Sequence, residues 1–126
     1  MTSKEVMTSE EAPERVVTGQ TMLAALVATL LLEVITLVAR YGLRLDSTRD
    51  TASTIGRLTF GLRIHHGYVG AALLLAAYGL SQTHPRGSRL VFIAGASLLA
   101  SDAVHHFLIL WPIEGTPQFD LWYHAP

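Results

Sequence analysis

The chain contains no cysteine, few charged residues and no marked excess of either sign of charge. The absence of cysteine excludes disulfide bonds, thiolate metal sites and thiol nucleophiles. Charged residues make up only 15% of the 126 residues, against about a quarter in a typical soluble domain. A net charge of −1 offers no basic surface to a nucleic acid, so no nucleic-acid partner is expected.

Half of the residues are hydrophobic, and they concentrate in three stretches. The stretches cover about residues 21–43, 64–80 and 90–111, and Glu33 is the one charged residue between positions 21 and 39. A helix needs about 20 apolar residues to cross a bilayer, so the second stretch is at the lower limit. The sequence therefore predicts an all-α, integral membrane three-helix bundle whose transmembrane domain covers residues 21–112.

The remaining segments are predicted to lie outside the hydrocarbon region. Residues 1–20 form an acidic tail, which is unlike the positive start of a signal peptide. Residues 81–88 read as a tight turn, so the second and third spans are expected to form an antiparallel hairpin. Residues 113–126 form an aromatic and acidic tail that suits the headgroup layer.

The expected location is multi-pass in a membrane, which in a bacterium would be the inner (cytoplasmic) membrane. The lipid bilayer is then one partner. Three helices alone are few for a transporter, so further copies of the chain or other membrane subunits are also expected as partners.

Ionisable side chains inside the apolar stretches gather toward one end. In an antiparallel hairpin, the histidine doublets at 65–66 and 105–106 lie at the same membrane face. At about 1.5 Å per residue, the four histidines lie roughly 3–9 Å inside the bilayer, and Asp102 and Glu33 roughly 14 Å inside. Ionisable groups at such depth are normally paired, hydrated or functional. We therefore expect a layer of imidazoles above two carboxylates.

Helical spacing places several of these groups on common faces. Asp102 precedes His105 by three residues and His106 by four, so its carboxylate is expected to share a face with both imidazoles. Three further residues are expected beside the site, as hydrogen-bonding partners or proton acceptors: Glu33, Arg40 and Ser101.

The first functional hypothesis is a metal centre near one leaflet. Imidazole and carboxylate ligands suit iron, zinc or copper. Neighbouring helices that each supply a carboxylate and a nearby histidine are how metal sites are built in helix bundles. Such a centre would serve redox or lipid-modifying chemistry. The predicted ligands are His65, His66, Asp102, His105 and His106.

The histidine doublets resemble in part the histidine boxes of membrane fatty-acid hydroxylases and desaturases, which bind two irons. The resemblance covers only residues 64–66 and 102–106. Those families carry more histidines, in longer boxes, than the six in this chain. The resemblance therefore assigns the chain to no family.

Three other functions are compatible with the same residues. One histidine from each doublet can serve as an axial ligand of haem b, with Gly67 and Gly70 letting the porphyrin approach the backbone. Glu33, Asp102 and the histidines can form a proton or cation relay. The chain can also be a purely structural small subunit of a larger membrane complex.

These alternatives leave both an enzyme and a cofactor-holding subunit open. The tail emerges on the same side as the histidines, so three of its residues are candidates to cover the site: Glu114, Asp120 and His124.

Overall fold

The computed structural model describes residues 15–46, 50 and 53–123. Within these residues the chain is helical, which confirms the all-α prediction, and the β geometry is limited to an isolated antiparallel bridge between Leu62 and Trp122. Most of the predicted acidic tail at 1–20 lies outside the described residues, as does His124.

The first long helix is α1 (Gly19–Leu37), and it continues as the π-helix η1 (Val38–Gly42). A reciprocal cap begins it, because the Thr21 amide donates to the Thr18 hydroxyl and the Thr18 amide donates to the Thr21 hydroxyl. The 24 residues from Gly19 to Gly42 extend roughly 36 Å at 1.5 Å per residue, more than the ~30 Å hydrocarbon core of a bilayer.

The second long helix is a run of three helical segments without a break: α5 (Pro85–Ala103), the π-helix η2 (Val104–Leu110) and α6 (Trp111–Glu114). It begins at Pro85, so the predicted turn at 81–88 is wrong in its second half. Proline favours the first helical turn because its φ is already helical and its missing N–H is not needed there.

Two shorter helices complete the fold. α3 (Ile55–Leu58) lies in the connection after η1, and α4 (His66–Leu80) is apolar but only 15 residues long. The helix α6 ends where Gly115 turns the chain with a φ of 74°, a left-handed conformation that glycine adopts without strain.

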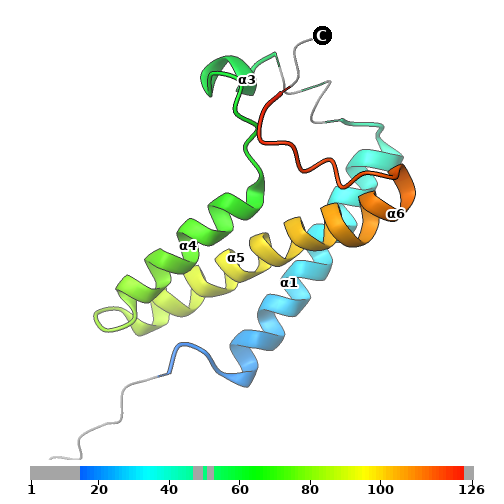
Figure 1. The fold of residues 1–126 in the computed structure, drawn as a ribbon. Helices are drawn as coiled ribbons and strands as arrows, with labels where there is room; N and C mark the ends of the chain where they lie inside the picture. The colour runs from blue at the N-terminus through cyan, green and yellow to red at the C-terminus, as the bar shows by residue number, and fades with distance from the viewer. Residues whose placement is uncertain (1–14, 47–49, 51–52, 124–126) are drawn as a thin grey trace, which may run out of the picture.

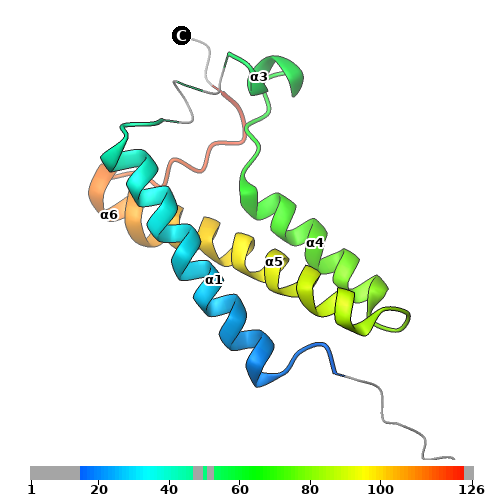
Figure 2. The same cartoon turned by 180° about the vertical axis from the view of Figure 1, so that it is seen from behind.

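α5 is the central helix of the assembly (Figure 1). α4 runs antiparallel beside it, as the predicted hairpin requires, and α1 crosses α5 obliquely (Figure 2). The α4 and α5 backbones touch at Gly70 and Gly95, because a Cβ added to Gly70 would lie 2.6 Å from the Leu99 backbone nitrogen. Small residues let helix backbones approach this closely.

The segments that precede and follow these helices lie together at one end of the molecule. The end of α1–η1, the start of α4 and the end of η2 converge there, and residues 115–123 lie across them (Figure 1). The Arg63 amide donates to the Leu121 carbonyl at 2.9 Å and the Tyr123 amide donates to the Gly61 carbonyl at 2.8 Å. The tail is thus tied to the segment that leads into α4.

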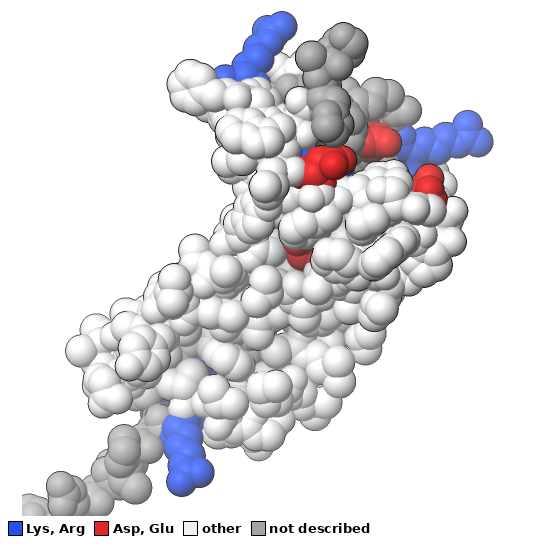
Figure 3. Space-filling model, in the orientation of Figure 1, with Lys and Arg blue, Asp and Glu red and all other residues white. Residues whose placement is uncertain are grey.

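Polarity is distributed in the opposite sense to a water-soluble protein. The buried residues of α1 are Thr21, Ala25, Thr29 and Glu33. The buried hydrophobic residues of the whole described chain are Ala25, Ala77 and Leu110, while many large aliphatic side chains face outward. On the face shown in Figure 3, charged atoms gather at the two ends and the middle is almost free of them. Two helices, Gly19–Gly42 and Pro85–Glu114, are long and apolar enough to cross a bilayer.

Candidate metal centre

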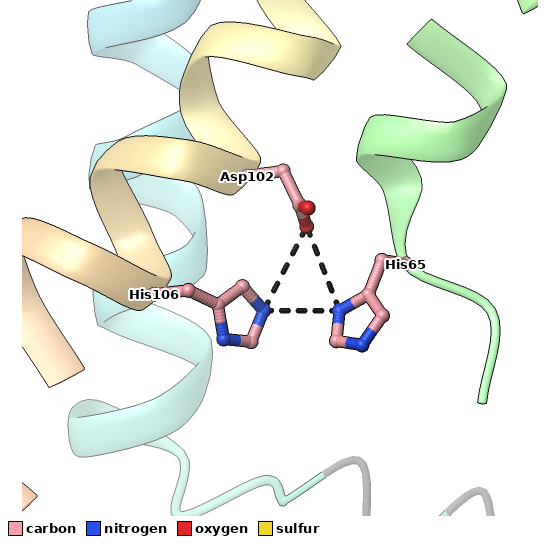
Figure 4. Close-up of side chains that lie close together, drawn as sticks. All are labelled: His65, Asp102 and His106. Atoms are coloured by element: carbon pink, nitrogen blue, oxygen red, sulfur yellow. Dashed lines mark hydrogen bonds and ion pairs between the residues drawn. The ribbon is translucent and has the colours of Figure 1, made fainter. Parts of the chain in front are cut away.

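His65, Asp102 and His106 form a buried group that can hold a metal ion (Figure 4). Nδ1 of His65 lies 3.2 Å from Nε2 of His106. Oδ1 of Asp102 lies 3.9 Å from the first nitrogen and 3.7 Å from the second. A tetrahedral ion with bonds of about 2.0–2.1 Å separates its ligand atoms by roughly 3.3–3.4 Å. The three atoms therefore match one ion with only small adjustments.

Three different structural elements position this group. His65 is the extended residue directly before α4, Asp102 lies in the last turn of α5, and His106 lies one turn later in η2. Gly67 makes room for the carboxylate, because a Cβ at this position would lie 2.6 Å from Oδ2 of Asp102. The start of α4 is thereby held directly against the carboxylate.

Backbone carbonyls of the tail determine which imidazole nitrogen carries the proton. Nε2 of His65 lies 3.2 Å from the Asp120 carbonyl oxygen, and Nδ1 of His106 lies 2.7 Å from the Pro117 carbonyl oxygen. A carbonyl can only accept, so each of these nitrogens must donate its N–H. In a neutral ring, the other nitrogen then presents a lone pair. These bare nitrogens are Nδ1 of His65 and Nε2 of His106, which face each other.

Three electron-rich atoms therefore point toward one place. They are the two bare nitrogens and Oδ1 of Asp102, which is buried and has no hydrogen-bond partner among the described residues. The two nitrogens lie within hydrogen-bond distance (dashed line in Figure 4), but in the neutral rings both N–H groups are already used, so a hydrogen bond between them requires an added proton. An unsatisfied buried acceptor costs about 1–3 kcal/mol. The arrangement thus favours a cation at its centre, either a metal ion or an added proton.

The tail also packs directly on the site. The Phe119 ring stacks on the His65 ring with centroids 4.3 Å apart and planes 19° from parallel. Asp120, which was a candidate to cover the site, does so through its backbone carbonyl, and Glu114 instead lies 3.6 Å from Arg40. Histidine spacing carries no signal for Pro117 or Phe119, and both were missed.

Glu33, Ser101 and His105 form a second buried cluster, between α1 and α5. Nδ1 of His105 donates to Oε1 of Glu33 at 2.9 Å, and the Ser101 hydroxyl donates to Oε2 at 3.3 Å. Each carboxylate oxygen therefore has a donor. Glu33 and Ser101 were expected beside the metal, and the structure brings them instead to His105.

Asp102 was predicted to share one helix face with His105 and His106. This prediction is wrong for His105, which turns to Glu33. Adjacent residues of a helix point about 100° apart. Because α4 and α1 pack on different parts of the central helix, His106 reaches the α4 side and His105 reaches the α1 side. Both histidines lie in the π-helix η2, and π segments often occur at functional sites.

The other two predicted residues lie at the margins. Nδ1 of His66 lies 3.2 Å from Oδ1 of Asp102 in an orientation that makes no hydrogen bond, and the His66 side chain is 37% exposed. Arg40 donates to the Gln118 side chain at 3.1 Å and lies 3.6 Å from Glu114.

No protein-family model, curated protein or solved structure matches this chain. The residues and contacts described above are therefore what bears on its function.

Proposed function

We propose that the chain is an integral, multi-pass membrane protein in which α1, α4 and α5–η2 cross the bilayer as a three-helix bundle and hold a transition-metal ion near one leaflet. The polar and small interior and the aliphatic exterior of the helices support insertion. In a bacterium this would be the inner membrane. Its partners would be bilayer lipids together with further copies or other membrane subunits.

The helix α4 is short for a bilayer crossing, so in this placement the chain before it would complete the span. Its 15 residues extend roughly 22 Å, less than the hydrocarbon core, so the non-helical chain before it would enter the apolar region. Irregular backbone is tolerated at such depth only where protein covers it. Residues 115–123 provide this cover through the hydrogen bonds at Gly61 and Arg63.

The observation that carries the metal proposal is that His65 and His106 each place one ring nitrogen against a backbone carbonyl of the tail. Metal-bound histidines generally donate their second N–H to a carbonyl or carboxylate, and both of these histidines do so. The ligands would be His65, His106 and Asp102, with His66 beside the carboxylate. Nitrogen and oxygen ligands suit zinc, iron or copper. Three protein ligands leave one position open, as in catalytic rather than structural sites.

Haem b is less compatible with the same geometry. Two axial bonds of about 2 Å each require ligand nitrogens roughly 4 Å apart, whereas those of His65 and His106 are 3.2 Å apart. The two glycines expected to admit the porphyrin admit α5 instead, because Asp102 fills the space at Gly67 and the α5 backbone fills it at Gly70.

An optical spectrum and an elemental analysis of the same detergent-purified sample test this proposal. We expect one equivalent of transition metal per chain and no Soret band. A Soret band would instead make the chain a haem-binding subunit. A colourless, metal-free protein that takes up no added metal would leave the proton relay or the structural subunit. Resistance of the membrane-bound protein to an alkaline wash tests insertion separately.

A further inference from the structure

A cavity of about 560 Å³ adjoins the imidazole side of the candidate metal centre. It lies between the converging ends of η1, α4 and η2, and its volume is within the ~300–1,000 Å³ typical of small-molecule sites. All four histidines of the two doublets line it, His65 and His106 among them, whereas Asp102 is buried and does not. A metal held by these three residues would therefore have its open position toward the cavity.

The walls of the cavity combine the histidines and other polar side chains with aliphatic ones, and the charges of the arginines and aspartates cancel. Two arginines in the lining, Arg40 and Arg63, are matched by two aspartates, Asp46 and Asp50. A divalent ion bound by one carboxylate keeps a charge of +1 and favours an anionic ligand at its open position. The aliphatic part of the lining is formed by Ala39, Leu45, Ile55, Ile64 and Leu110.

We infer that this cavity binds an aliphatic carboxylate, a fatty-acid-like amphiphile whose carboxylate completes the coordination of the metal. The alkyl chain lies against the aliphatic wall, where its burial adds affinity that a short anion lacks. This inference rests on the proposed metal centre, and it names the substrate class of that centre.

Titration of the Co²⁺-loaded full chain in a non-ionic detergent tests the inference. The visible bands of Co²⁺ report on its ligands, and octanoate, acetate and octan-1-ol are the probes. Burial of only two methylene groups is worth about tenfold in affinity. Octanoate is therefore expected to shift the Co²⁺ bands at a free concentration at least about tenfold below that of acetate. Octan-1-ol, which lacks the anion, is expected to leave the bands unchanged.

Two variants locate the alkyl chain. Ile64→Trp and Ile55→Trp each place a larger side chain in the wall, and both positions are partly exposed, so a larger ring does not overpack a core. Each variant is expected to weaken octanoate binding about tenfold, the value of roughly two buried methylene groups, while Co²⁺ and acetate bind as before.

The outcomes separate the two proposals. A normal Co²⁺ spectrum with equal affinity for octanoate and acetate overturns the amphiphile site and leaves the metal centre intact. Octanoate binding that neither tryptophan variant weakens also overturns the site. Failure of the wild-type chain to bind Co²⁺ or any other transition metal overturns the metal centre, and the inference with it.

Discussion

The α4–α5 and α1–α5 interfaces each bury one carboxylate beside imidazoles, but they satisfy it differently. Both oxygens of Glu33 accept hydrogen bonds, from His105 and Ser101. Oδ1 of Asp102 accepts none from the described residues. The difference arises because His105 donates its N–H to the carboxylate, whereas His65 and His106 donate theirs to backbone carbonyls of the tail.

This contrast shows that the same residue types can form a closed polar network or an open ligand set. In the α1–α5 cluster both carboxylate oxygens are satisfied without a ligand, so this cluster is expected to stabilise the fold. The α4–α5 cluster has two bare nitrogens and a carboxylate oxygen that accepts no hydrogen bond from the described residues, so it is expected to need a cation. Four sets of variants test this distinction.

The largest effect is expected from the two histidine ligands. His65→Ala and His106→Ala each remove one ligand and should lower metal affinity at least about hundredfold, since even loss of a residue that only supports a ligand costs 10–100-fold. Competition with a chelator measures this affinity. His105→Ala is the matched control from the same doublet and should retain the metal. Equal losses for His105→Ala and His106→Ala would abolish the distinction between the two interfaces.

The two carboxylates should respond to amide substitution with opposite signs in the metal-free protein. Asp102→Asn introduces an N–H donor among bare acceptors and should raise the stability by about 1 kcal/mol. Glu33→Gln weakens a satisfied charged pair and should lower it by about 1.5–3 kcal/mol. Thermal unfolding in detergent, with a chelator present, measures both changes. A destabilising Asp102→Asn would mean that the metal-free site is already satisfied.

The close approach at Gly67 should be sensitive to a single methyl group. Gly67→Ala would place a Cβ 2.6 Å from Oδ2 of Asp102 and displace the carboxylate. Overpacking of this kind costs about 1–3 kcal/mol, so metal affinity should fall about tenfold. Gly79→Ala is the control in the same helix, because a Cβ there meets nothing within 4 Å. Unchanged affinity in Gly67→Ala would show that Asp102 is not held in place for the metal.

The smallest effect is expected from the tail. Phe119→Ala removes the ring stacked on His65, and such contacts are worth about 0.5–1.5 kcal/mol, or roughly 2–10-fold in metal affinity. The half-exposed Trp122 supplies the control, since Trp122→Ala removes an aromatic ring of the same tail. Equal effects of the two substitutions would show that the tail acts without the specific contact to His65.

The contrast between the two interfaces could not be predicted from residue spacing. The i+3 and i+4 offsets place His105 and His106 equally well near Asp102. The choice between them depends on where α1 and α4 lie around α5, which is decided by contacts far apart in the chain, such as the backbone contact at Gly70 and Gly95. The start of α5 at Pro85 was predictable in principle, because proline favours the first turn of a helix.

The sequence by itself determined that the chain is helical, that its helices are apolar, and that four histidines and two carboxylates lie toward one end. These properties follow from the order of polar and apolar residues and from the fixed rise of a helix. Only the tertiary structure decided which carboxylate is left without a donor. That outcome depends on the carbonyls of Pro117 and Asp120, and main-chain carbonyls are the same at every position in a sequence until the fold directs them at a particular side chain.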